Sequence, residues 1–460
     1  MSDLDVVIEN MPVKELHSVL KYSYFKGKDR LTLGITIKKF KIEITNLRSD
    51  TIQKDLKMRD ITVNSIAFKV ENGKIIDKPL DPTGGINDIH YRILRTYDKK
   101  NLRDDPLRIL RILRFNSVLG YQIESSTLNF MSKYANLLKE VPEERIQREI
   151  SSIILGKNSA NALRTMYISG ILKMIIPELE ICGTFLHKDK YHFGESIFEH
   201  SLRVIENCET DLDMKLSALL HDIAKPLVYG KKRPGSYIGH DIEGTEISEK
   251  ILSRLKFPKN TVKNVGNIIR NHMIFYESEK VIRKLAFKYD NILFDKIIKF
   301  IKADKMATNI KWLETEAYDI YEQNSRLGEK STILFERIRN EINGKKIMEC
   351  GLNKGPWMKQ IIDYLHNYIL EKPSRMDDFN VKIKLERELL FNDEYSKFRY
   401  GKIKTNRIKE YFLDNKVFGL LENEKVLNIK TGIFEFNYLK KKDYELCLKE
   451  NSGYHILFQQ

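Results

Sequence analysis

The chain has 460 residues, of which 42% are hydrophobic, and this is enough apolar material for several buried cores. Lysine and arginine outnumber the acidic residues by 79 to 64, and the net charge of +15 favours a polyanionic partner such as nucleic acid or an anionic membrane. The four cysteines are far apart and form no CxxC pair, which argues against a zinc knuckle or a disulfide scaffold. Because no basic-then-apolar leader opens the chain and no apolar stretch approaches the roughly 18 residues of a membrane span, the sequence predicts a cytoplasmic protein with no membrane contact.

The first 85 residues predict a small β-sheet. The runs "LTLGITI" and "FKIEIT" alternate with period 2, and "SIAFKVENGKIID" predicts two strands joined by an Asn-Gly turn. If residues 4–10 form the first strand, Asp3 and Asp5 point to one face, roughly 6–7 Å apart. Glu43 is expected to reach the same face. Such carboxylates are suited to hold two Mg²⁺ ions for nucleotidyl transfer, so these three residues are predicted to be catalytic, with Asp3 and Asp5 as metal ligands.

The period of the apolar residues becomes helical at "NLRDDPLRILRILRF", where Leu107, Leu110, Ile112 and Leu113 form a stripe. This helical pattern continues to about residue 390. The last 70 residues are rich in aromatic side chains and contain "VLNIKTGIFEFNYL", which predicts a hairpin. Their function cannot be read from the sequence.

A second group of residues with metal-binding chemistry lies in the helical part. The segments "FEHSL", "LLHDIAKP", "GHDIEG", "RNHM" and "FIKADKMATN" supply His200, His221, Asp222, His240, His272 and Asp304. Imidazoles and carboxylates of this kind suit a divalent metal such as Mg²⁺, Mn²⁺, Ni²⁺ or Fe²⁺, which would activate water for attack on phosphorus. Lys225 follows Asp222 by three residues and is predicted to bind the substrate phosphate, as a further catalytic residue. Pro226 is expected to end the helix.

Four segments, "MRDITVNSIAF", "DPTGGINDI", "RDDPLRILRILRF" and "VPEERIQREI", occur in this order between residues 58 and 150. Together they resemble the class II tRNA nucleotidyltransferases, which are the CCA-adding enzymes and their bacterial poly(A) polymerase relatives. The resemblance implies contacts of Arg59, Asp60 and Asn64 with the sugar and phosphates of the nucleotide. It also implies that Asp105 and Arg108 hydrogen-bond the edge of the incoming base from one helix face. The predicted nucleotide-binding residues are Arg59, Asp60, Asn64, Asp105, Arg108, Arg111 and Arg114.

Several of these residues have alternative structural explanations. Asp105 before Pro106 also fits a helix N-cap, and the arginines 108, 111 and 114 also fit a solvated or RNA-phosphate-binding face. Glu144, Arg145 and Glu149 match a later family motif that braces the neck helices. Gly84 and Gly85 resemble the family's hinge between head and neck.

The order His, His-Asp, His, His, Asp resembles the HD phosphohydrolase superfamily, whose domains occur at this place in many bacterial tRNA nucleotidyltransferases. The resemblance implies one metal held by His200, His221, Asp222 and Asp304. His240 and His272 are then available for a second metal or for substrate phosphate. HD domains attached to this family act on 2′,3′-cyclic phosphates and phosphate monoesters.

The chain departs from the family at its start, because the glycine-rich segment that holds the triphosphate is missing before Asp3. We therefore expect a truncated head with weakened or lost transfer. The predicted fold is α+β, with a small nucleotidyltransferase-like sheet followed by a long all-α body. The predicted domains are the truncated head (1–85), a helical neck for base and RNA binding (86–180), an HD domain (181–330), a helical tRNA-binding tail (331–390) and a C-terminal extension (391–460).

The leading interpretation is a tRNA nucleotidyltransferase that adds CMP and AMP from CTP and ATP to the 3′ end of tRNA by two-metal chemistry. One alternative is an HD phosphohydrolase with an inactive head. Another is a tRNA-binding protein without catalysis. The sequence does not indicate an oligomeric state.

Overall fold

The computed structural model describes residues 2–381 except 10, 21, 27–31, 38–39, 77, 189–193, 275–277, 309–315, 328–330, 350–357 and 378, together with four strands beyond residue 428. The chain divides into two compact units. The first comprises Met1–Phe275 and Asp295–Thr315, and the second comprises Tyr276–Phe294 and Glu316–Gln460.

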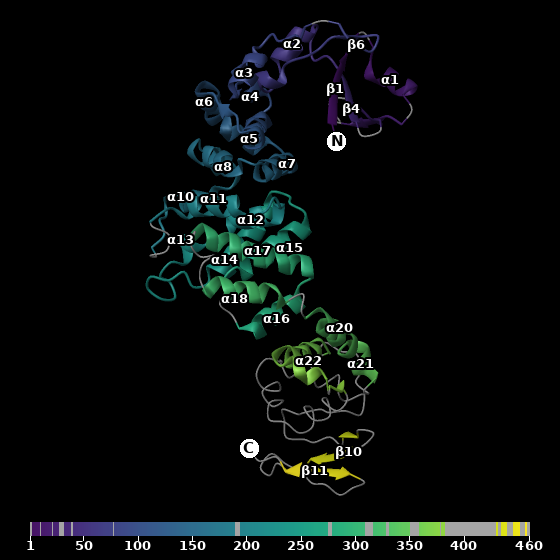
Figure 1. The fold of residues 1–460 in the computed structure, drawn as a ribbon, viewed down its shortest axis with the longest axis vertical. Coiled ribbons are helices and arrows are strands. Elements are labelled where there is room, and N and C mark those ends of the chain that lie inside the picture. Colours follow the sequence, from purple (N-terminus) through teal and green to yellow (C-terminus); the bar gives the residue numbers. More distant parts are fainter. Residues whose placement is uncertain are drawn as a thin grey trace. The chain divides into compact units, whose positions relative to one another are not determined.

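A four-stranded mixed sheet opens the first unit (Figure 1). Its strand order is β1 (Ser2–Ile8), β4 (Phe40–Asn46), β3 (Thr32–Ile37) and β2 (Tyr24–Lys26). β1 pairs with β4 in parallel, and the other two pairs are antiparallel. The helix α1 (Val13–Val19) packs against this sheet, with Val13, Leu33 and Ile44 buried between them. The predicted sheet is confirmed, and its first strand begins at Ser2.

The segment after the sheet contains the predicted hairpin, which is shorter than the sequence indicated. Its strands β5 (Val70–Glu71) and β6 (Lys74–Ile75) have two residues each, and Asn72 and Gly73 both have positive φ, as a type I′ turn requires. Gly84, with φ of 80°, precedes α3 (Gly85–Tyr91). A Cβ on Gly85 would lie 2.1 Å from the backbone oxygen of Thr62, so this position needs glycine for close packing. The hinge role of the two glycines stays a prediction.

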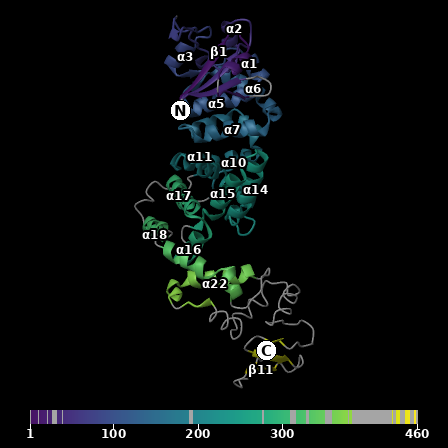
Figure 2. The same ribbon diagram turned by 90° about the vertical axis from the view of Figure 1, so that its right-hand side faces the viewer.

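The neck is helical apart from one short parallel strand pair, β7 (Ile93–Leu94) and β8 (Gln122–Ile123). The helix α2 (Ile52–Lys57) still belongs to the head. The helices of the neck are α4 (Lys99–Asp104), α5 (Leu107–Leu119), α6 (Ser125–Tyr134), α7 (Glu143–Leu155), α8 (Ser159–Ile168) and α9 (Ile171–Ile175), and α10 (Glu180–Thr184) follows at its end. The predicted apolar stripe of α5 is buried. The helix packs against α7, which lies beside it in Figure 2, and against α8. This packing fixes the face of α5 that carries the arginines.

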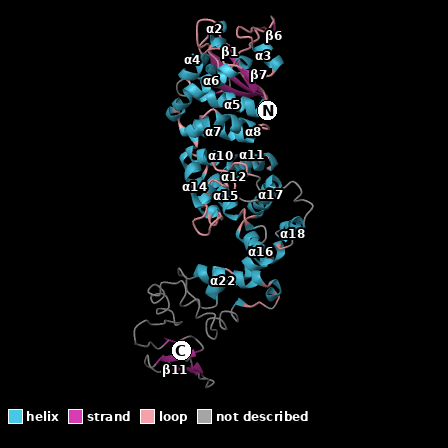
Figure 3. Ribbon diagram, turned by 90° about the vertical axis from the view of Figure 1, so that its left-hand side faces the viewer, coloured by secondary structure: helices cyan, strands magenta, loops and turns pink. Residues whose placement is uncertain are grey.

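The next helices carry or adjoin the predicted metal-binding residues. They are α11 (Ile197–Asn207), α12 (Leu212–Leu220), α13 (Lys225–Val228), α14 (His240–Arg254), α15 (Lys259–Asn271) and α17 (Asn291–Thr308). Several of them, including α11, α12, α14 and α15, are grouped together in Figure 3. α17 is tied to α11 by a hydrogen bond of 3.1 Å from the Asn207 side chain to the Ala303 carbonyl. The expectation for Pro226 is wrong, because α12 already ends at Leu220 and Pro226 lies in the first turn of α13. Backbone N–H groups in a first helical turn make no intrahelical hydrogen bond, so a proline costs none there.

The second unit contains α16 (Glu279–Lys288), α18 (Glu316–Ser325), α20 (Thr332–Glu341), α21 (Gly344–Glu349) and α22 (Met358–Glu371). The buried Arg283 of α16 donates to the Leu370 carbonyl of α22 at 2.7 Å. An antiparallel sheet follows, made of β9 (Ile429–Lys430), β10 (Phe434–Tyr438), β11 (Glu445–Glu450) and β12 (Ile456–Leu457). The pairing of β9 with β10 confirms the predicted hairpin, whereas residues 382–390 of the predicted tail lie outside the described part. Among the helices that the structure describes, none is both long and apolar enough to cross a membrane.

Candidate nucleotide site and metal centre

The strand register places Asp3, Asp5 and Glu43, the three predicted acidic residues of the head, at positions on one face of the sheet. Asp3 lies opposite Lys41 and Asp5 lies opposite Glu43 in the parallel pair β1 and β4, so residues at these positions share a side of the sheet. Asp5 is exposed. The Glu43 carboxylate contacts the ammonium groups of Lys26 at 2.5 Å and Lys41 at 3.1 Å. The hydrogen bond from Lys26 is the main reason why the pKa of Glu43 lies below its usual value. Glu43 is therefore ionised and already paired with two lysines.

The Arg-Asp motif of the neck is joined to α5 by a buried ion pair. Asp60, of which only 4% is exposed, accepts from Arg111 Nε at 2.7 Å and from the side chain of Asn64 at 3.3 Å. Burial alone would raise the pKa of Asp60, but the guanidinium of Arg111 holds it below the usual value. Arg59 donates to the Asn64 carbonyl at 3.4 Å. Four of the predicted nucleotide-binding residues thus form one connected group.

The predicted base-reading pair lies at the junction of α4 and α5. Arg108 Nε is 3.8 Å from one oxygen of Asp105, and Arg145 of α7 is 3.6 Å from the other. Asp105 does not cap α5, because the N-cap residue of this helix is Pro106. Arg114 pairs with Glu149 of α7 at 3.4 Å. Two of the three α7 residues that the sequence assigned to bracing, Arg145 and Glu149, therefore contact predicted nucleotide-binding residues directly.

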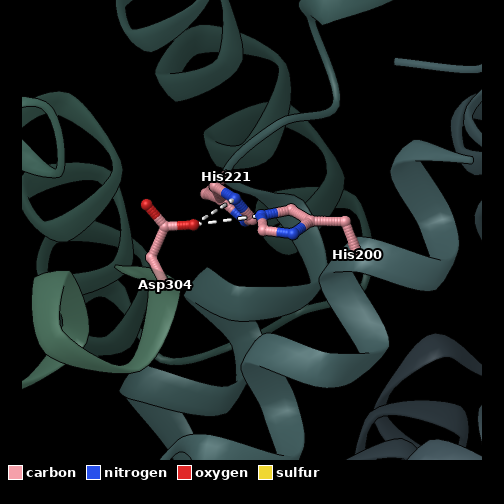
Figure 4. A group of neighbouring side chains, drawn as sticks. All are labelled: His200, His221 and Asp304. Carbon is pink, nitrogen blue, oxygen red and sulfur yellow. Dashed lines mark hydrogen bonds and ion pairs between the residues drawn. The ribbon is translucent and has the colours of Figure 1, made fainter. Parts of the chain in front are cut away.

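The six predicted metal-binding residues come together in one buried cluster, which we call the six-residue cluster. It contains two groups, His200 with His221 and Asp304, and Asp222 with His240 and His272, and within each group the ligand atoms lie within 4.8 Å of one another. In Figure 4 the side chains of the first group converge from three helical segments. Asp304 Oδ1 is 3.0 Å from His200 Nε2 and 3.6 Å from His221 Nε2.

Asp222 lies between the two groups. Its Oδ2 is 3.1 Å from His221 Nε2 and 3.9 Å from His200 Nε2, and its Oδ1 is 3.6 Å from His240 Nε2 and 4.0 Å from His272 Nε2. One carboxylate therefore faces both groups, and this arrangement suits two divalent ions that share a ligand. The sequence placed Asp222 in a single four-ligand site and did not indicate this second contact.

Three of the four histidines are oriented by backbone carbonyls. His221 and His272 cap the C-terminal ends of α12 and α15, and their Nδ1 atoms lie 3.0 Å from the Ala218 oxygen and 2.6 Å from the Ile269 oxygen. His240 opens α14, with Nδ1 2.8 Å from a carbonyl three residues earlier. Because a carbonyl can only accept, a proton on each Nδ1 leaves the Nε2 lone pair for a metal. The Nε2 atoms of His240 and His272 are 3.2 Å apart, so without a cation between them one of the two must carry a proton.

His200 is oriented differently because it lies inside α11. Its Nδ1 is 3.8 Å from the carboxylate of Glu195, which precedes the N-cap residue Ser196. Glu195 is in turn bound by the guanidinium of Arg203, which also donates to the Ala307 carbonyl at 3.1 Å. The sequence analysis missed Glu195. Its position one turn before a candidate histidine ligand is the signal that could have indicated it.

The electrostatics of the six-residue cluster fit a metal site. Burial lowers the pKa of His200 to about 4 and that of His272 to about 3, so both are neutral at pH 7. Burial alone would raise the pKa of Asp222, but His221 and Lys225 hold it well below the usual range. Burial would lower the pKa of His221, and Asp222 nevertheless raises it above the usual value.

Two buried atoms of this cluster have unused bonding capacity. Within the part of the chain that the structure describes, His221 Nε2 and Asp222 Oδ1 accept or donate no hydrogen bond. Buried polar atoms of this kind normally have a partner, and a divalent cation would satisfy both. Lys225, expected to bind phosphate, contacts Asp222 Oδ2 at 2.7 Å and so lies beside the predicted metal position.

Family models match three successive parts of the chain. Residues 1–95 match the poly(A) polymerase head domain, residues 120–182 the probable RNA and SrmB-binding site of polymerase A, and residues 197–318 the HD domain. The A-adding tRNA nucleotidyltransferase of Deinococcus radiodurans is 30% identical over 270 residues, which are 56% of this chain and 60% of the relative. The CC-adding tRNA nucleotidyltransferase of Thermus thermophilus is 29% identical over 325 residues, which are 66% and 70% of the two chains.

Solved structures support the same fold. The CCA-adding enzyme of Bacillus stearothermophilus, solved with CTP, has a TM-score of 0.56 at 20% identity and aligns over 81% of this chain and 85% of its own. The Thermotoga maritima CCA-adding enzyme, solved with tRNA, has a TM-score of 0.51 at 17% identity over 85% and 86% of the two chains. The chain therefore contains, in this order, segments similar to the poly(A) polymerase head, its RNA-binding region and an HD domain, and in sequence it is similar to tRNA nucleotidyltransferases.

Proposed function

We propose that the chain is a tRNA nucleotidyltransferase that adds CMP or AMP to the 3′ end of tRNA, with CTP and ATP as substrates. The observation that carries this proposal is the pairing of Asp105 with Arg108 beside the buried Asp60–Arg111 ion pair. Cytosine and adenine both present an exocyclic amine next to a ring nitrogen, so a carboxylate that accepts and a guanidinium that donates can bind either base. Guanine and uracil present a carbonyl oxygen at the position of that amine, and the carboxylate would repel it.

The chain's own residues divide the work of this reaction. Mg²⁺ held by Asp3 and Asp5 would activate the 3′-hydroxyl of tRNA and neutralise the leaving pyrophosphate. Asp60 holds the Arg111 guanidinium in a fixed orientation for the nucleotide. The positive net charge of +15 supports binding of the tRNA backbone, and we propose a cytoplasmic location for this activity. The five segments with limits at 85, 180, 330 and 390 are retained as proposed domains.

The test is incorporation of labelled CTP and ATP into tRNA that lacks its 3′ CCA, in the presence of Mg²⁺. The double variant Asp3→Ala/Asp5→Ala is expected to lose incorporation of both nucleotides. Asp105→Ala is expected to lose discrimination against UTP and GTP, whereas the matched variant Asp104→Ala, at a mostly exposed neighbouring position, should keep it. Incorporation by the double variant, or none by the unmodified chain, would reject a transferase that uses these carboxylates.

We propose metal-dependent hydrolysis of phosphate esters as a second activity, because the buried six-residue cluster has two groups of ligands around Asp222. Mg²⁺, Mn²⁺, Ni²⁺ and Fe²⁺ are the candidate ions. With a 2′,3′-cyclic phosphate, water would add to phosphorus, one ester P–O bond would break, and the leaving sugar oxygen would take up the proton. Lys225 lies where it can bind the phosphate.

The second activity is tested by hydrolysis of 2′,3′-cyclic AMP after reconstitution with each metal in turn. His221→Ala and Asp222→Ala are expected to abolish hydrolysis while CTP incorporation continues. Salt-sensitive tRNA binding without either activity would leave only a tRNA-binding protein.

A further inference from the structure

Two segments next to the six-residue cluster are basic and contain no acidic residue. They are residues 185–188, "FLHK", and residues 229–239, "YGKKRPGSYIG", and we call them the lip. Their cations are Lys188, Lys231, Lys232 and Arg233, all of which are exposed. The two segments are joined by a hydrogen bond of 2.8 Å from the Lys188 backbone nitrogen to the Tyr237 hydroxyl. The lip is therefore one continuous basic feature.

A row of aromatic rings crosses the lip toward the six-residue cluster. The rings of Phe185 and Tyr229 are 5.8 Å apart, and those of Tyr229 and Tyr237 are 5.2 Å apart. The row continues through His187, which is 6.4 Å from Tyr237 and 5.4 Å from the metal-site residue His200. Its two ends differ in exposure, because the Phe185 and Tyr229 side chains are half-buried and the two histidines are buried.

The lip also adjoins the second group of ligands. It ends at Gly239, whose φ of 94° leads directly into α14 and its first residue His240. The Lys232 ammonium lies 3.2 Å from where a Cβ of Gly239 would be. On the other side, the Lys225 ammonium is 5.3 Å from the ring centre of Tyr237. Ligand groups on both sides of Asp222 are therefore next to lip residues.

We propose that the lip binds the last nucleotides of a single-stranded RNA whose terminal phosphate enters the six-residue cluster. This proposal rests on the proposed hydrolase activity and names its substrate class. A mononucleotide has one phosphate, and the bound metals and Lys225 would neutralise it. The cations of residues 231–233 would then have no phosphate to bind. An oligonucleotide brings further phosphates to these cations, and its bases can stack on Tyr229 and Phe185.

The first test compares two substrates, 2′,3′-cyclic AMP and a decaribonucleotide that ends in a 2′,3′-cyclic phosphate. The triple variant Lys231→Ala/Lys232→Ala/Arg233→Ala is expected to lower the ratio of kcat/KM for the decamer to kcat/KM for the mononucleotide by at least about tenfold. The matched triple variant Lys250→Ala/Lys259→Ala/Lys263→Ala removes the same charge from exposed positions of α14 and α15 and should leave this ratio within about twofold. An unchanged ratio in the lip variant, or equal losses in both variants, would overturn the proposal.

A second test does not depend on hydrolysis. Binding of a fluorescent decamer with a 3′-phosphate is followed by anisotropy at several salt concentrations. Loss of three phosphate contacts is expected to reduce the slope of log K against log salt by about 2, because each contact with a single strand contributes about 0.7. Tyr229→Ala should weaken binding and Tyr229→Phe should not. If neither substrate is hydrolysed but the salt slope falls in the lip variant, the hydrolase proposal fails while RNA binding by the lip is supported. An unchanged slope in the lip variant rejects RNA binding by the lip.

Discussion

Glu195 is expected to control how tightly the first group of ligands binds its metal. The variant Glu195→Gln removes the charge that faces His200 Nδ1 at 3.8 Å and keeps the size of the side chain. The other three histidines keep their orientation in any side-chain variant, because backbone carbonyls hold their Nδ1 atoms at 2.6 to 3.0 Å. Loss of one carboxylate behind a ligating histidine weakens metal binding by about 10- to 100-fold.

The structure places the expected effect at the lower end of that range. At 3.8 Å the Glu195–His200 contact is longer than a hydrogen bond, and Arg203 shares the same carboxylate. We therefore expect a dissociation constant for Mn²⁺ about tenfold higher, which corresponds to about 1.4 kcal/mol.

The assay is calorimetric titration of the chelator-treated chain with Mn²⁺. Glu199→Gln is the matched control, because Glu199 also lies in α11 but pairs with Arg164, at 2.7 Å. An unchanged Mn²⁺ affinity in Glu195→Gln would refute the reasoning. An equal loss in both variants would assign the effect to the stability of α11 and not to the orientation of His200.

Three further predictions concern stability and are read from urea unfolding. Gly85→Ala should lower the free energy of unfolding by about 3 kcal/mol, because the added Cβ would lie 2.1 Å from a backbone oxygen; an unchanged midpoint contradicts this. Asp60→Ala should lower it by about 1 to 2 kcal/mol, because Arg111 loses its buried partner but is itself 36% exposed and partly solvated; an unchanged midpoint would show that solvent fully replaces the pair. Without metal, the free energy of unfolding should fall as the pH drops from about 6.5 toward 4, because the unfolded chain takes up protons at His200 and His272 that the folded chain does not. His221, whose pKa is raised, offsets part of this loss. A urea midpoint that rises on acidification would contradict the low pKa values of His200 and His272.

The sequence was informative where a residue type had a fixed place in the local structure. The ligand residues His221, Asp222 and His272 lie next to helix ends, and the six-residue cluster contains the six candidate ligands that the sequence named in the helical part. The carboxylate of Asp222 faces both groups because residues from four other segments surround it. A local sequence pattern does not indicate this orientation. The wrong expectation for Pro226 has the same origin, because proline is compatible with the start of a helix as well as with its end.

In the head and neck too, local patterns predicted the contacts within one element but not those that depend on packing between elements. Period-2 alternation predicted the strands and therefore the shared face of Asp5 and Glu43. Lys41 lies two residues before Glu43 in β4, so the same alternation places both on one face, whereas the approach of Lys26 from β2 depends on a register that the alternation does not determine. Likewise, the spacing of Asp105 and Arg108 predicted their contact, whereas the link from Asp60 to Arg111 spans 51 positions and follows from how the helices pack.

The position of α17 has a consequence for how the protein is made. Asp304 completes the first ligand group, but it follows a stretch, Tyr276–Phe294, that belongs to the second compact unit. During translation five of the six ligands are therefore synthesised before Asp304, and a product that ends near residue 290 would lack the carboxylate that closes the group around His200. Closure of the first group, unlike that of the second, therefore requires that a segment of the second unit has already been synthesised.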